Sequence, residues 1–243
     1  MRMLSFALRN TKEILRDPLS IIFGLGFPVV LLLLLSAIQA NIPVPLFQIN
    51  SLAPGVTVFG LSFLTLFTST IIAKDRSSSF LQRLYTTPLT PADFILGYTL
   101  PILPMAMAQC AICYLTAFLL GLDLTVNVLY SVAMSIPISL VFIALGLLFG
   151  SILNEKQVGG ICGALITNLS AWLSGIWFDL ALVGGAFKDV AYALPFVHAV
   201  DMQRAIIAGN LTEILPDLCW ILGYAVILFL AATLLFLRQM KKQ

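Results

Sequence analysis

Charged residues are scarce in this chain. Asp, Glu, Lys and Arg make up 10% of its 243 residues and 60% are hydrophobic, whereas a soluble domain carries about 25% charged residues. The mean hydropathy is +1.04. Water cannot solvate so apolar a surface, so we expect an integral membrane protein in contact with lipid. The net charge of +2 offers little basic surface, so no nucleic-acid partner is expected.

The sequence also lacks the residue sets that catalytic and metal sites need. His198 is its single histidine, and the four cysteines lie in apolar stretches without nearby histidines; we interpret these cysteines as packing residues. No Gly-x-x-x-x-Gly-Lys-Ser/Thr phosphate loop is present. We therefore predict that the chain is not an enzyme and holds no metal or cofactor of its own. Any energy from ATP must come from another chain.

Six apolar stretches are long enough to cross a bilayer, which takes about 20 helical residues. Their expected bounds are 19–38, 55–73, 94–121, 126–153, 158–178 and 217–237. Continuous apolar runs exclude the alternation of a β-barrel, so we predict an all-α integral membrane protein with one transmembrane domain over residues 1–243. Eleven of the thirteen Lys and Arg residues fall on the side of the termini. This bias predicts a multi-pass protein of the cell membrane with both termini cytoplasmic.

Two segments outside the spans are expected to lie at the membrane boundary. Residues 1–17 predict an amphipathic interfacial helix on the cytoplasmic face, ended by Asp17-Pro18. Residues 179–216 are mostly apolar although they lie between the fifth and sixth spans. We expect them to form a re-entrant helical hairpin in the outer leaflet, in which Gly209 ends an amphipathic helix.

Residues 74–93 form the largest expected cytoplasmic loop. An apolar stripe that begins at Phe80 predicts a short helix, which Pro88 cannot continue. Thr90 and Asp93 then have the spacing of a capping box at the start of the third span. Two interpretations of the short helix stay open, because it could dock on a partner or pack back onto its own bundle.

Polar residues inside the spans are hydroxyls and amides rather than acids and bases. Thr65 and Ser69 lie in the second span and Asn168 in the fifth. Such side chains either hold helices together or line a translocation path. Gly146 and Gly150, one turn apart, allow another helix to approach closely.

The loop after the second span reads Asp75-Arg76-x-x-Ser79-Phe80-Leu81-Gln82-Arg83-Leu84-x-Thr86-Thr87-Pro88-Leu89, followed by Ile95-Leu96-Gly97. This pattern closely resembles the cytoplasmic signature of ABC type-two exporter permeases. Members of that family typically read Glu-Arg-x-x-Gly-Thr-Leu-Glu-Arg-Leu-x-x-Thr-Pro-Leu and then Leu-Gly-Lys. The resemblance covers essentially the whole chain. Among the departures, Asp75 replaces the usual Glu and Tyr98 the usual Lys.

The resemblance implies the membrane subunit of an ATP-driven exporter. A second copy of the chain, or a homologous permease, would complete the translocation path, and a separate ATP-binding cassette subunit would bind ATP and Mg. Carried over by position, the residues that couple to this ATPase are Asp75, Arg76, Arg83, Leu84, Thr86, Thr87 and Pro88. Apolar walls with scattered hydroxyls fit an amphipathic drug, a lipid-like compound or a peptide. The alternative is a secondary transporter or channel that works without an ATPase, against which the charge-free spans count.

Overall fold

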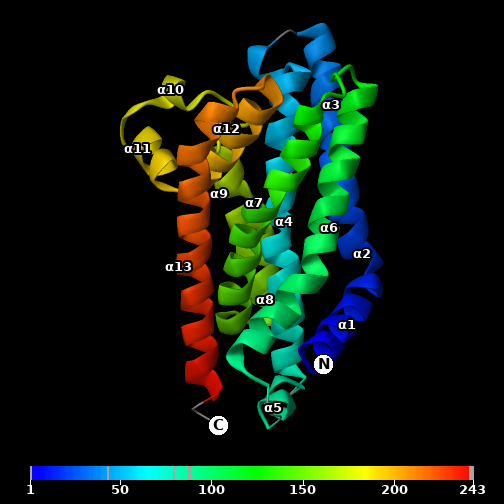
Figure 1. Ribbon diagram of the computed structural model, residues 1–243, viewed down its shortest axis with the longest axis vertical. Helices are drawn as coiled ribbons and strands as arrows, with labels where there is room; N and C mark the ends of the chain where they lie inside the picture. Colours follow the sequence, from blue (N-terminus) through cyan, green and yellow to red (C-terminus); the bar gives the residue numbers. More distant parts are fainter. Residues whose placement is uncertain (1, 43, 79, 87–88, 241–243) are drawn as a thin grey trace.

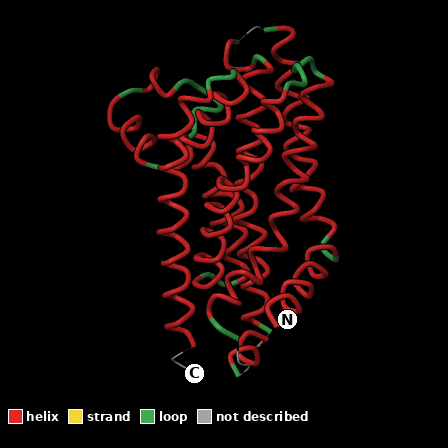
Figure 2. The backbone as a smooth tube through the Cα atoms, viewed as in Figure 1, coloured by secondary structure: helices red, strands yellow, loops and turns green. Residues whose placement is uncertain are grey.

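The computed structural model describes residues 2–42, 44–78, 80–86 and 89–240, and within these ranges it contains helices and no strand (Figure 2). The predicted all-α class is therefore confirmed. Five helical segments are long and apolar enough to cross a membrane. They are η1 with α3 (Ile22–Gly26 and Phe27–Asn41), α4 (Ile49–Ser77), α6 (Pro91–Leu119), α7 (Val126–Ile152), and η4 with α13 (Leu211–Glu213 and Ile214–Met240).

The other elements are shorter. They are α1 (Arg2–Leu15), α2 (Pro18–Ile21), η2 (Pro45–Phe47), α5 (Phe80–Tyr85), α8 (Glu155–Val158), η3 (Gly159–Ile166), α9 (Thr167–Trp172), α10 (Leu180–Val183), α11 (Gly185–Ala193) and α12 (Pro195–Ala208). The start of α1, the end of α13 and α5 lie at one end of the bundle, called the terminal end below (Figure 1). The helices α10, α11 and α12 lie at the opposite, distal end.

The most buried of the long helices is α4, which packs against α7, α6, α12 and α3. Its closest seam is with α7. A Cβ atom added to Gly146 would lie 2.5 Å from Cβ of Thr68, and one added to Gly150 would lie 2.8 Å from Cα of Ser69. The expectation that Gly146 and Gly150 allow close helix approach is confirmed, because no larger side chain fits at either position.

The fifth expected span, residues 158–178, is shorter and less regular than predicted. A helical run begins at α8, continues as the π-helix η3 and stops with α9 at Trp172. Glycine is a poor helix former, and three glycines lie in the η3 segment. Beyond α9 the chain turns through Gly175, whose positive φ of +68° suits glycine. The run lies alongside α4 and is not among the five long apolar helices.

Local signals set the ends of several helices as predicted. Thr90 and Asp93 form a complete capping box at the start of α6. Gly209, in the left-handed region with φ of +83°, ends α12. The amide of Gln203 on α12 donates to the carbonyl of Ser131 at 3.0 Å, and Gln203 is fully buried. Although it lies between two spans, α12 is thus an integral part of the core at the distal end.

Candidate functional site

Asp75, near the end of α4, connects three helices at the terminal end. Its Oδ2 accepts a hydrogen bond from Nη1 of Arg9 on α1 at 2.7 Å and another from the hydroxyl of Tyr98 on α6 at 2.9 Å. The residue is only 2% exposed. A buried carboxylate needs such charged and hydrogen-bonding partners, so this contact fixes the position of α1 against α4 and α6.

Apolar and amide contacts add to this attachment of α1. The ring of Phe6 lies edge-on to Tyr98, with centroids 4.9 Å apart. Nδ2 of Asn10 donates to the carbonyl of Gly97 at 3.0 Å. A Cβ atom on Gly97 would lie 2.2 Å from Cδ1 of Phe6. At Gly97, where no side chain intervenes, α1 therefore packs directly on the backbone of α6.

The two residues after Asp75 connect α4 to the opposite side of the bundle. The guanidinium of Arg76 donates to the carbonyls of Ser151, Ile152 and Leu153 at the end of α7. A cation at a helix C-terminus satisfies carbonyls that have no partner within the helix and opposes the negative end of the dipole. The hydroxyl of Ser77 donates to the Glu155 carboxylate at the start of α8. We call residues 75–77 the α4 junction.

Directly after the α4 junction, α5 lies at the tip of the terminal end (Figure 1). Its inner side is anchored, because Leu81 is 2% exposed and the Arg9 guanidinium lies 4.3 Å from the Phe80 ring centroid. Its outer side is open at Arg83, which is exposed, as is Thr86 directly after the helix. The short helix predicted from Phe80 is confirmed, and it has both an inner packed face and an outer free face.

The predicted coupling residues thus fall into separate groups. Asp75 and Arg76 belong to the α4 junction and bind other parts of the same chain, whereas Arg83 lies on the outer face of α5 and Thr86 is exposed directly after this helix. Leu84 is partly buried and packs against the core. Thr87 and Pro88 lie outside the described residues.

The predicted path residues also separate. The hydroxyl of Thr65 donates to the carbonyl of Phe142 on α7 at 3.0 Å, and Ser69 donates to the carbonyl of Thr65 at 2.6 Å. Both side chains are fully buried within the bundle. Asn168, on α9, is exposed and donates to the carbonyl of Ala164. A path along Thr65 and Ser69 stays a prediction, since in the single chain these hydroxyls connect α4 to itself and to α7.

Sequence reasoning missed Arg9, Phe6 and Asn10 as partners of the α4 junction and of α6. One signal was available, because Asp75 and Tyr98 both depart from the pattern that the sequence otherwise resembles. The two departures are in direct contact, with the Tyr98 hydroxyl donating to the Asp75 carboxylate.

The fold and the α4 junction define a multi-pass helical membrane protein. In it the short helix α5, at the tip of the terminal end, follows directly on the central long helix α4. A family model described as ABC-2 type transporter matches residues 2–208. The chain therefore belongs to that family and is the membrane permease component of an ABC transporter, not itself a catalytic subunit. The family implies an ATP-binding cassette partner. A search of the curated proteins found no matching relative.

Proposed function

We propose that this permease is half of the membrane unit of an ATP-driven exporter, with α5 as the element that docks on a separate ATPase subunit. The observation that carries the proposal is the two-sidedness of α5. Leu81 and Phe80 hold the helix against its own bundle, while Arg83 and Thr86 face outward. A helix that transmits force needs both a fixed inner side and a free outer side. Export rather than import rests on the sequence resemblance.

The α4 junction supports transmission from α5 into the membrane. Asp75 binds α1 and α6, Arg76 binds the end of α7, and Ser77 binds α8. Each of these contacts lies within five residues of the start of α5. A displacement of α5 by the ATPase would therefore act on four other helices through one short segment. ATP-driven closure of the partner subunits would move α5, and through the α4 junction this movement would open the path alternately to the two sides of the membrane.

We further propose six crossings, with the terminal end in the cytoplasm. The run from α8 to α9 would provide the fifth crossing, and the positive-inside bias gives the orientation. Helix α1 would lie in the cytoplasmic interface, since Leu4, Leu8 and Leu15 are 58%, 57% and 67% exposed and suit the acyl boundary of a bilayer. The segment from α10 to α12 would form the re-entrant hairpin of the outer leaflet.

Two copies of the chain would form the translocation path between them. Asn168 supports this arrangement, because an exposed amide at span depth is costly in lipid and is expected to face protein or a cavity. Among the three predicted path residues, Asn168 is the one that a second copy or a substrate can reach without opening the bundle.

The docking assignment is tested by co-purification of the chain with its separate ATP-binding cassette subunit. We expect Arg83→Glu to abolish ATPase association while leaving membrane insertion and thermal stability unchanged. The matched control is Arg238→Glu, which reverses the charge of another exposed residue at the terminal end, on α13. Wild-type recovery of the ATPase with Arg83→Glu would refute the docking role of α5.

A further inference from the structure

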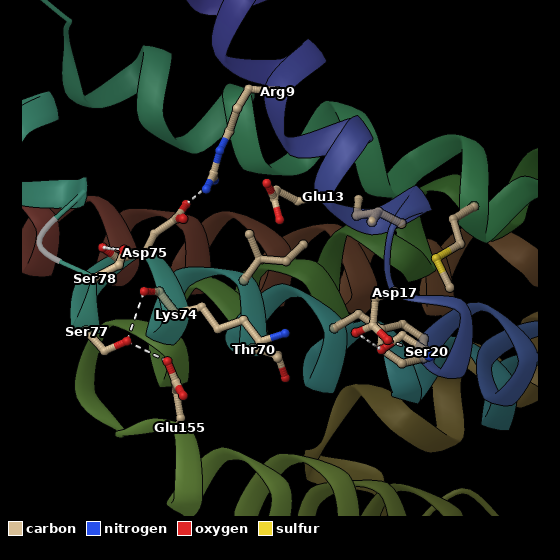
Figure 3. A pocket seen from close by; sticks show the side chains of 14 residues that line it. Arg9, Glu13, Asp17, Ser20, Thr70, Lys74, Asp75, Ser77, Ser78 and Glu155 are labelled. Atoms are coloured by element: carbon tan, nitrogen blue, oxygen red, sulfur yellow. Dashed lines mark hydrogen bonds and ion pairs between the residues drawn. The ribbon is translucent and has the colours of Figure 1, made fainter.

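A cavity of about 410 Å³ opens at the terminal end between α1, α2, α4, α6 and α8 (Figure 3). Its size lies in the range of pockets that enclose drug-sized ligands, roughly 300–1,000 Å³. It lies beside the α4 junction, since Asp75 and Ser77 contribute to its lining. Neither the family assignment nor the docking role of α5 gives this space a ligand.

The inner wall of the cavity is apolar. Ile14 of α1, Phe67 and Ile71 of α4, and Met105 of α6 line it. The π-helix η1 packs closely against this wall at Gly24, where an added Cβ atom would lie 2.6 Å from Cε2 of Phe67 and 2.7 Å from Cε of Met105. Aromatic and thioether groups adapt well to apolar ligands, and the face of an aromatic ring also attracts cations.

The polar part of the lining is acidic. Four carboxylates and two cationic side chains contribute to it, which leaves an excess of negative charge. The residues are Glu13, Asp17, Asp75 and Glu155 against Arg9 and Lys74. Because Arg9 and Asp75 neutralise each other, three carboxylates remain around one ammonium group.

These three carboxylates have weak or neutral partners. Asp17 accepts from the hydroxyl of Ser20 at 2.7 Å, and this bond lowers the pKa of the Asp17 carboxyl, so Asp17 is ionised at neutral pH. Glu13 reaches Arg16, outside the cavity, at 3.8 Å between exposed groups. Lys74 makes no ion pair within 4.0 Å among the described residues, and its ammonium extends into the space between Asp17, Glu13 and Glu155 (Figure 3).

We infer that this cavity binds an amphipathic organic cation. The apolar body of the ligand lies on Phe67 and Met105, and its positive charge takes the position between Asp17 and Glu13 that the flexible Lys74 ammonium now approaches. An anion of the same shape would meet an excess of carboxylates, and an uncharged one would leave them without a counter-charge. That the bound cation is the transported substrate, collected at the cytoplasmic mouth of the path, rests on the proposed function; the binding itself does not.

Tetraphenylphosphonium and tetraphenylborate test the charge preference, because they share an apolar shape and differ in sign. Binding is measured by equilibrium dialysis with the full chain in nanodiscs, and the uptake of empty nanodiscs is subtracted. We expect saturable binding of tetraphenylphosphonium at one site per chain, and no saturable binding of tetraphenylborate. Equal saturable binding of both ions, or of neither, would overturn the proposal.

Charge-only substitutions locate the site. Asp17→Asn keeps a side chain that caps a helix equally well, and we expect it, like Glu13→Gln, to weaken tetraphenylphosphonium binding about tenfold. Lys74→Gln removes the competing cation and should strengthen binding several-fold, a gain that a misfolded variant would not give. The control is Asp123→Asn, at an exposed site in the connection between α6 and α7, and this variant should bind tetraphenylphosphonium as the wild type does. Unchanged binding in both Asp17→Asn and Lys74→Gln would place the ion elsewhere and refute the site.

This measurement is independent of the docking experiment. It uses the permease without its ATPase, so binding could fail while Arg83→Glu still abolishes ATPase association. Conversely, an intact cation site in a chain that recruits no ATPase would leave the cavity proposal standing and remove the proposed function.

Discussion

The carboxylate of Asp75 lies 2.7 Å from the guanidinium of Arg9, although 66 positions separate them in the chain. The Asp75 side chain is 3% exposed and that of Arg9 is 34% exposed. An ion pair with one buried partner is costly to break, because the remaining charge loses its counter-charge without gaining water. This pair makes α1 a fixed part of the bundle rather than a loose surface helix.

Replacing Asp75 should therefore loosen α1. We expect Asp75→Ala to destabilise the protein by about 2–3 kcal/mol, since Arg9 and Tyr98 both lose their acceptor. In a double-mutant cycle, Arg9→Met should recover about 1 kcal/mol of that loss by removing the unpaired cation. Thermal unfolding of the four proteins in one detergent gives the coupling energy. Additive effects would mean that the pair contributes nothing to stability.

The features that were predicted from the sequence are those that depend on residues close together in the chain. The capping box of Thr90 and Asp93 and the C-cap at Gly209 follow from neighbouring residues. Apolar composition located the five long helices but not all their bounds, since α4 runs over Ile49–Ser77 where 55–73 was expected. The partners of Asp75 could not be found in this way, because Arg9 and Tyr98 lie 66 and 23 positions away. Their contact is set by how α1, α4 and α6 pack in three dimensions.

The coupling residues show a second limit of sequence reasoning. Asp75, Arg76 and Arg83 share one motif, and position alone gave them one role. Burial separates them, because only Arg83 lies on an exposed face. For the expected fifth span, residues 158–178, the irregular helix geometry was not predicted, since the apolar composition concealed the effect of the glycines.

Arg76 and Arg83 should accordingly respond differently to loss of charge. We expect Arg76→Gln to lower the free energy of unfolding by about 1–2 kcal/mol, because three carbonyls at the end of α7 lose a cationic donor. Arg83→Gln should change it by less than about 0.5 kcal/mol, as is usual for an exposed side chain. Thermal unfolding of both variants checks this difference, and equal losses would contradict the division between the α4 junction and the α5 outer face.

Gly97 should not tolerate a side chain. The ring of Phe6 is enclosed by Phe94 and Tyr98 and cannot move away from a new methyl group, so Gly97→Ala should cost about 1–3 kcal/mol. The control is Gly223→Ala on α13, where no atom lies within 4 Å of an added Cβ atom. That substitution should be neutral or stabilise by up to about 1 kcal/mol. A Gly97→Ala protein as stable as the control would show that α1 can shift on α6 without penalty.

Asp201 on α12 should make stability depend on pH. Burial raises the pKa of its carboxyl from 3.8 to about 6, against the opposing charge of Arg204 and with a further rise from Asp217. His198, which lies on the same helix, lowers the pKa of Asp201 as Arg204 does, and Asp179 raises it as Asp217 does.

Because the folded state holds this proton more tightly than the unfolded state, stability should fall as pH rises from about 4 to about 6. Asp201→Asn keeps the shape of the side chain and cannot ionise. We expect it to raise the melting temperature at pH 7.5 and to leave it unchanged at pH 4. A melting temperature that follows pH identically in both proteins would exclude Asp201 as the source of the dependence.

The glycine seam between α4 and α7 has a mechanical consequence. With Gly146 against Thr68 and Gly150 against Ser69, α4 and α7 have no space in which to slide along each other. We therefore expect them to move as one rigid body. The change in shape during a transport cycle must then occur at hinges elsewhere. The two π-helical stretches, η1 and η3, are candidates for these hinges, since a wide helical turn can convert to a tighter one and shift the register of all that follows.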